Sequence, residues 1–219
     1  MFRGRAIPLV VPVYLLAAWP AFLLTHENAW VHANLGYRIP DLTGAPLRAL
    51  GTFVTAPLFN HAWDQLIYAT VLLVLFGLFT EWQVGIRRTA IAFVSTQLAA
   101  AMVAGTALHL IYPAISDAGL FEEAWNRTYT GASAGAVGLY GLFATRRRWP
   151  LAFLLAFVTW ELAVWWVYLE NYTPAFHLTA LFTGFCLGTW AWPLRCVDRG
   201  DRGTGLRSRN PTNGRPDSA

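Results

Sequence analysis

Six apolar segments constrain this chain more than any other feature of its sequence. A membrane-spanning helix needs about 20 mainly apolar residues to cross a hydrocarbon core about 30 Å thick. Segments of this kind can be placed at residues 6–25, 65–82, 89–112, 131–145, 150–169 and 176–192. The sequence therefore predicts an all-α membrane protein, with a six-helix bundle that forms a single domain over residues 1–197.

Composition supports the same class. Hydrophobic residues make up 56% of the 219 residues and charged residues 13%, and the mean hydropathy is +0.41. That charged share is about half that of a soluble domain. A soluble fold of this size could not bury so much apolar surface, whereas lipid allows it to stay exposed. We expect the chain to lie in the cell membrane, with the bilayer as its surroundings.

Arginine distribution predicts the orientation. All sixteen basic residues are Arg, and thirteen of them lie before the first segment or after the second, fourth and sixth. Because basic connections stay in the cytoplasm, both termini are predicted to be cytoplasmic, which requires an even number of spans. The positive charge is thereby explained without a nucleic-acid partner. Residues 198–219 are rich in Arg, Gly, Asp, Ser and Pro, and we expect a disordered cytoplasmic tail.

The connection between the first two segments is unusual. Its second half, residues 45–62, is too apolar for a solvated loop. Gly51 and Pro57 also make it a poor continuous span. We expect a membrane-embedded first loop, interfacial or re-entrant, that packs on the rest of the protein.

Two polar residues lie at the outward ends of apolar segments. At 1.5 Å per residue, Ser133 is about 20 Å along its helix from Arg146, and His177 is about 22 Å from Trp192. The two side chains are therefore predicted at similar depth, and histidine is the usual base for a serine nucleophile. Small residues recur every three or four positions in both segments, and such faces allow helices to cross closely in lipid. These residues are Gly131, Gly135, Gly138, Ala180, Gly184 and Gly188.

These motifs resemble the rhomboid family of intramembrane serine proteases. The run Gly-Ala-Ser-Ala-Gly at 131–135 is followed two helices later by His177, Leu181, Gly184 and Gly188 in the family's spacing. Residues 55–63 resemble the family's segment that leads into its second helix. Phe76, Gly77, Glu81 and Gly85 resemble the cytoplasmic end of that helix. The resemblance covers roughly residues 45–190, and helix count and topology agree.

The resemblance implies a specific chemistry. Rhomboids use a Ser–His dyad, which places Ser133 as nucleophile and His177 as general base. The substrates would be transmembrane segments of other membrane proteins, cleaved near the outer face. Gly131 and the other glycines would let the backbone N–H of the serine help to hold the oxyanion. We see no metal-ligand cluster or nucleotide fingerprint in the sequence, and we expect no cofactor or metal.

One departure from the family concerns the oxyanion site. Rhomboids commonly carry His-x3-Asn at the start of the second helix, and those side chains support the oxyanion. An ungapped alignment from Glu81 puts Gln65 and Ala69 at these positions. Gln65 can still donate through its amide, whereas Ala69 cannot, and Asn60 and His61 are the nearest substitutes. The sequence leaves open a slow protease or a family member that has lost catalysis.

Glu161 is the remaining ionisable group inside an apolar segment, where charge is costly. It lies nearer the middle of the membrane than Ser133, so we expect a hydrogen bond to a neighbouring helix and not a triad role. Two rival functions remain open. One is a non-catalytic rhomboid-like protein that binds transmembrane helices. The other is a small transporter that uses Glu161 and His177 as substrate or proton sites, although no internal repeat is apparent.

Overall fold

The computed structural model describes residues 7–114, 125–167 and 172–192. Within these ranges the chain is helical, and its only extended pairing is an isolated bridge between Tyr37 and Tyr129. The all-α prediction is therefore confirmed. The predicted disordered tail at residues 198–219 lies outside the described residues.

Each of the six expected segments is helical. The first is α1 (Val10–Thr25), and the second is α5 (Trp63–Leu72), which continues through a π-turn into α6 (Leu78–Val84). The third is α7 (Ile86–Ala99), which continues through a π-turn into α8 (Gly105–Ile111). The last three are α10 (Ser133–Ala144), α11 (Pro150–Val167) and α12 (Thr173–Cys186), the last followed by a π-turn over Leu187–Ala191.

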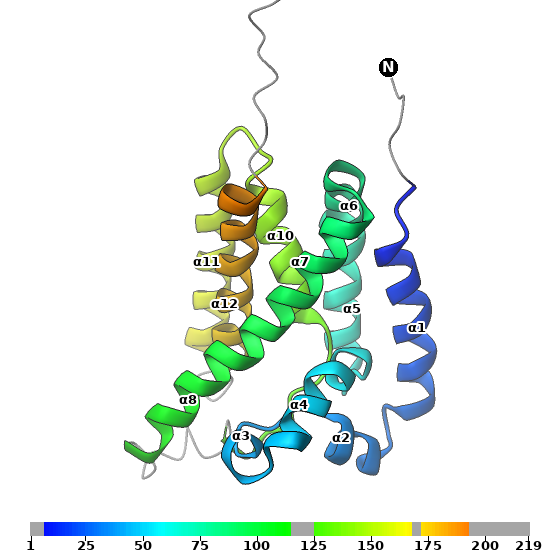
Figure 1. Cartoon of the computed structure of the whole chain (residues 1–219), viewed down its shortest axis with the longest axis vertical. Coiled ribbons are helices and arrows are strands. Elements are labelled where there is room, and N and C mark those ends of the chain that lie inside the picture. Colours follow the sequence, from blue (N-terminus) through cyan, green and yellow to red (C-terminus); the bar gives the residue numbers. More distant parts are fainter. Residues whose placement is uncertain (1–6, 115–124, 168–171, 193–219) are drawn as a thin grey trace, which may run out of the picture.

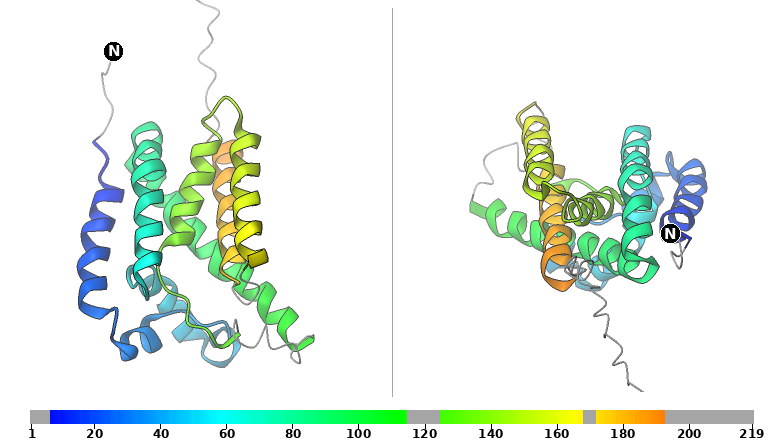
Figure 2. Two further views of the ribbon diagram at one scale, coloured as in Figure 1. Left: turned by 180° about the vertical axis from the view of Figure 1, so that it is seen from behind. Right: turned by 90° about the horizontal axis from the view of Figure 1, so that it is seen from above.

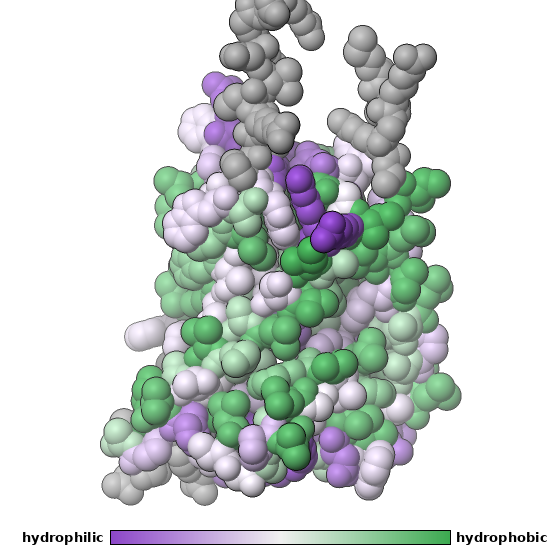
Figure 3. All heavy atoms as spheres, viewed as in Figure 1, coloured by the Kyte–Doolittle hydropathy of each residue, from purple (hydrophilic) through white to green (hydrophobic). Residues whose placement is uncertain are grey.

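Three of these helices are long and apolar enough to cross a membrane. They are the continuous helices Trp63–Val84, Ile86–Ile111 and Pro150–Val167, while Val10–Thr25 and Ser133–Ala144 are shorter apolar helices. These features indicate a membrane protein. In Figure 3, hydrophobic side chains cover the middle of the visible face, and polar side chains gather towards its two ends.

The helices run up and down around α10. Viewed from above, α10 lies at the centre, with α5, α7, α11 and α12 around it (Figure 2). Every residue of α10 is buried. The start of α1 and the connections from α6 to α7 and from α10 to α11 lie at one end of the bundle (Figure 1). Arg87 and Arg88 lie at this end in the first turn of α7, and Arg146 to Arg148 lie in the connection after α10.

The long connection between α1 and α5 lies at the opposite end (Figure 1). It consists of α2 (Ala29–Leu35), α3 (Asp41–Gly44), α4 (Pro46–Thr55) and a 3₁₀ turn over Ala56–Leu58, so it is not a continuous span, as predicted. One face of α4 is buried, and Phe53 packs in a cluster with residues of α8 and α12. The other face exposes Leu47, Leu50 and Val54.

A buried carboxylate joins the first helix to the bundle. Glu81 of α6 is 1% exposed, and its oxygens accept hydrogen bonds from the backbone N–H groups of Leu9, Val10 and Val11 at 2.6, 2.7 and 3.1 Å. These N–H groups belong to the start of α1 and have no acceptor within the helix. A negative charge there is also favoured by the helix dipole. Glu81 therefore caps α1 from another helix.

The closest helix crossing joins α10 and α12. A Cβ atom placed on Gly184 would collide with the backbone carbonyl of Gly138, and one on Gly141 would collide with that of Leu181. The expected close approach of these two helices is present, and Gly138 and Gly184 form it. Gly135 instead faces Phe93 of α7. Gly131 precedes the helix, because α10 begins at Ser133 and not at residue 131 as predicted.

The crossing predicts a large effect for a very small substitution. Gly184→Ala should lower the free energy of unfolding by about 1–3 kcal/mol, because the added methyl meets backbone that cannot move aside. Gly51→Ala in α4 is the matched control, since a Cβ there has nothing within 4 Å. Thermal unfolding of the purified protein measures both. Equal stability of Gly184→Ala and the wild type would contradict the crossing.

Candidate functional site

The site begins with a sharp turn at the start of α10. Gly131 has φ +88°, a left-handed conformation that glycine adopts without strain. A Cβ there would lie 2.6 Å from Asn60 Oδ1 and 2.8 Å from Gln65 Nε2. The Gly131 N–H donates to the carbonyl of Ala56 at 2.8 Å. The turn is therefore fixed against the first loop, and it presents Ser133 as the first residue of α10.

Gln97 of α7 holds this turn from the other side. Its Nε2 donates to the carbonyl of Gly131 at 3.2 Å, and its Oε1 accepts the N–H of Gly135 at 2.7 Å. The two bonds bracket Ser133. Gln97 Oε1 thus accepts the N–H of Gly135, one of the first-turn N–H groups that have no acceptor within a helix.

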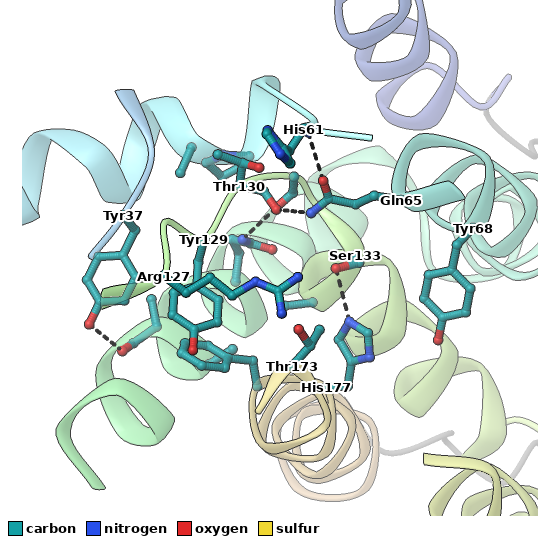
Figure 4. A pocket seen from close by; sticks show the side chains of 18 of the residues that line it. Tyr37, His61, Gln65, Tyr68, Arg127, Tyr129, Thr130, Ser133, Thr173 and His177 are labelled. Atoms are coloured by element: carbon teal, nitrogen blue, oxygen red, sulfur yellow. Dashed lines mark hydrogen bonds between the residues drawn. The ribbon is translucent and has the colours of Figure 1, made fainter. Parts of the chain in front are cut away.

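Ser133 and His177 meet across the crossing of α10 and α12. Ser133 Oγ lies 3.0 Å from His177 Nε2, within hydrogen-bond range, and both residues are buried. Figure 4 shows the two side chains pointing toward each other. They line a cavity of about 440 Å³ with walls from the first loop and from α5, α7, α10, α11 and α12. The contact expected from equal depth and small helix faces is present.

The other nitrogen of His177 contacts Glu161. Its Nδ1 lies 3.0 Å from Glu161 Oε2 of α11, and Glu161 is 3% exposed. Tyr68 of α5 donates its hydroxyl to Glu161 Oε1 at 3.0 Å. The Tyr68 ring also stacks on the His177 ring, with centroids 5.6 Å apart and planes 19° from parallel. Ser133, His177, Glu161 and Tyr68 thus form one chain of hydrogen bonds from four helices.

The expected hydrogen bond from Glu161 to a neighbouring helix is present. Glu161 does bond to neighbouring helices, but one of its partners is His177 itself. The estimate of depth from the sequence placed Glu161 away from Ser133 because it compared positions along the helices and took no account of the length of the side chain. His177 is on the second turn of α12, and the side chain of Glu161 reaches its Nδ1 from α11.

Gln65 has a different environment from the one expected of an oxyanion donor. Its Nε2 donates to the carbonyl of Thr130, and its Oε1 accepts the backbone N–H of His61 at 2.9 Å. Gln65 lines the cavity (Figure 4), yet one of its bonds joins α5 to the loop before Ser133 and the other holds the residues just before α5. One amide hydrogen remains beyond the bond to Thr130.

The two other candidates, Asn60 and His61, are neighbours in the chain but have different surroundings. Asn60 is fully buried and is not on the cavity wall. Ala69 is buried as well. His61 lines the cavity, with its ring edge-on to His32 at 4.8 Å. Partial burial, followed by the nearby His32 and Arg127, lowers the pKa of His61, which favours its neutral form at pH 7.

Three residues of this site were not identified from the sequence. Gln97 directly follows Ser95 and Thr96 in α7, and Tyr68 lies between Gln65 and Thr70 in α5, so no pattern in the sequence sets either residue apart. Arg127 reaches across the cavity from the loop before α10 (Figure 4). Within the described ranges, no three His, Cys, Asp or Glu side chains converge to hold a metal ion.

The arrangement has the parts needed for nucleophilic chemistry. The hydroxyl of Ser133 is bonded to a base, and the base is bonded to a carboxylate. The N–H of Ser133 begins α10, where it has no acceptor within the helix and where the dipole favours negative charge. No family model, curated protein or solved structure matched the chain in the three comparisons made.

The Gln97 bridge predicts a measurable loss. Gln97→Leu keeps the size of the side chain but leaves the Gly131 carbonyl and the Gly135 N–H without their partner. The free energy of unfolding should fall by about 1–3 kcal/mol. Gln83→Leu, at an exposed position on α6, is the control and should change stability little. The bridge would be unsupported if the two variants unfold at the same temperature.

Proposed function

We propose that the chain is an intramembrane serine endopeptidase of the rhomboid type, with Ser133 as nucleophile and His177 as general base. The observation that carries the proposal is the 3.0 Å contact between Ser133 Oγ and His177 Nε2 on the wall of a cavity. A buried hydroxyl in an apolar helix normally bonds a backbone carbonyl of its own helix. Here it bonds an imidazole on another helix, which is the geometry of an activated nucleophile.

The reaction follows from these positions. His177 Nε2 takes the proton of the Ser133 hydroxyl as Oγ bonds to the carbonyl carbon of a substrate peptide. The carbonyl electron pair moves onto oxygen, and the tetrahedral intermediate expels the amine, which takes the proton from Nε2. Water then repeats the sequence on the acyl-enzyme and releases the carboxylate product.

Backbone groups supply the first oxyanion contact. The N–H of Ser133 is free of intrahelical bonds and lies next to Oγ. The Gly131 turn and the Gln97 bridge fix this N–H relative to the hydroxyl, and such preorganisation is what stabilises a developing charge. A second contact comes from the remaining Gln65 amide hydrogen, since Gln65 also lines the cavity.

Membrane topology belongs to the same proposal. All six helices span the cell membrane, and both termini are cytoplasmic, with the Arg-rich connections on that side. Thr52 and Phe53 of α4 line the cavity, and α4 lies at the other end of the bundle (Figure 1). Substrates are then transmembrane segments of other membrane proteins, cut near the outer face where water enters.

A non-catalytic relative that binds transmembrane helices is the second candidate. One observation favours it: Gln65 is already bonded to Thr130 and His61, and Ala69 has no donor. Losing one oxyanion donor costs about 10²–10³ in rate. Labelling with a serine-reactive fluorophosphonate separates the two candidates, because a protein that only binds helices has no reason to activate Ser133.

The proposed topology predicts on which side of the membrane a fused reporter protein is active. A reporter joined after Arg209 should be active only on the cytoplasmic side, because an even number of spans returns the chain there. A second fusion in the connection between α1 and α5, after Gly44, should report the opposite side. Identical readings from the two fusions would contradict the proposed topology.

Activation of Ser133 is tested by a fluorophosphonate probe, which reacts with nucleophilic serines. The wild type in detergent or proteoliposomes should be labelled, whereas Ser133→Ala and His177→Ala should each lose labelling. The variant with both substitutions should show no less labelling than either single variant, because the two residues act as one unit.

Ser95→Ala on α7 is the matched control and should keep full labelling. Ser133→Ala should also fold and insert normally, since alanine fits the same crossing. Labelling that persists in Ser133→Ala would refute the assignment, and a wild type without any labelling would favour the non-catalytic candidate.

A further inference from the structure

We propose that Glu161 is a positioning residue that turns the Ser133–His177 pair into a triad, with Tyr68 holding its carboxylate in place. This inference rests on the proposed serine protease function and departs from the dyad that the family resemblance implies. The basis is the continuous chain of contacts from Tyr68 through Glu161 and His177 to Ser133, with each of these three contacts at 3.0 Å.

One assignment of donors and acceptors satisfies all three hydrogen bonds from Tyr68 to Ser133. With Glu161 ionised, its two oxygens accept from the Tyr68 hydroxyl and from the Nδ1–H of His177. That bond places the imidazole proton on Nδ1 and leaves Nε2 as an acceptor. Nε2 then faces the Ser133 hydroxyl in the tautomer that a general base requires. Without the carboxylate, nothing in this chain of contacts fixes the tautomer.

Ring orientation is fixed by the same groups. Tyr68 stacks on the imidazole at 5.6 Å and 19°, while its hydroxyl bonds the carboxylate. A histidine held by a bond at Nδ1 and a stacked face has little freedom to rotate away from Ser133. Tyr68 and Glu161 therefore act together, and neither has to touch the substrate.

A comparison with Glu81 shows why Glu161 is more than a structural carboxylate. Both glutamates are almost fully buried. The partners of Glu81 are three backbone N–H groups at the start of α1. The partners of Glu161 are two side chains, one of which is the proposed base. A charge in an apolar bundle is costly, and such residues are typically functional.

The role in the reaction is electrostatic. As Ser133 Oγ bonds to the substrate carbon, its proton moves to His177 Nε2 and the ring becomes positively charged. Glu161 stays ionised, keeps its hydrogen bond to Nδ1–H, and stabilises that imidazolium in a site of low dielectric. The proton later leaves Nε2 with the amine product, so no proton is transferred to Glu161.

The test measures how fast the fluorophosphonate probe inactivates each variant at saturation (kinact) and the probe concentration at half-saturation (KI). Glu161→Gln should lower kinact by about 10²-fold or more at unchanged KI. Tyr68→Phe keeps the stacked ring, loses the hydroxyl, and should lower kinact about tenfold. Glu161→Asp restores a carboxylate and should recover part of the loss.

Glu81→Gln is the matched control. It removes the other buried carboxylate, so it should lower thermal stability while the folded protein keeps the wild-type kinact. Histidine ring ¹⁵N–¹H spectra give a readout that does not depend on activity. A downfield Nδ1–H signal of His177 should be present in Ser133→Ala and lost in Glu161→Gln.

The outcomes separate the two proposals. Wild-type kinact in Glu161→Gln, in a protein whose labelling requires Ser133, would overturn the triad and leave the serine protease standing. If the Glu161→Gln protein does not accumulate, the other two variants decide the question. A wild-type kinact in both Glu161→Asp and Tyr68→Phe would then overturn the triad. Absence of Ser133-dependent labelling in the wild type would refute the protease and the positioning role with it.

Discussion

The backbone contact between α10 and α12 is the constraint on which the rest of the site depends. Gly138 and Gly184 bring the two helices together with no side chain between them. Lipid supplies no hydrophobic force between helices, so such packing stabilises the pair through close van der Waals contact. Because α10 begins at Ser133 and His177 is on the second turn of α12, a close crossing below them brings the two side chains within 3.0 Å of each other.

Polar groups around that crossing depend on one another. Gln97 and Gln65 fix the loop that precedes Ser133, and Glu161 and Tyr68 fix the ring of His177. In an apolar interior each unsatisfied polar group costs several kcal/mol, which makes a fully paired network more rigid than the same bonds in water. Catalysis by preorganised groups needs this rigidity, because the donors and the base must not reorganise during the reaction.

The helices could be predicted from the sequence, and so could the contact between Ser133 and His177. Runs of apolar residues mark segments such as 150–169, and depth along a helix follows from its fixed rise. The start of α10 differs from the prediction by two residues, because Gly131 fits a helical small-residue repeat in the sequence but adopts a positive φ in a turn packed against Asn60 and Gln65. The contact between Glu161 and His177 could not be predicted, because depth says nothing about which way a long side chain turns. The partners of Gln97 lie 34 and 38 residues away in the chain, so no local sequence pattern predicts them.

The central claim is that Ser133 is a nucleophile activated by His177. The most direct measurement is a structure of the protein after reaction with a fluorophosphonate. The account predicts a phosphorus atom bonded to Ser133 Oγ, its oxygen facing the N–H of Ser133 at the start of α10, and His177 still bonded to Glu161. Phosphorus on a different residue, or an unmodified Ser133 after prolonged reaction, would contradict it.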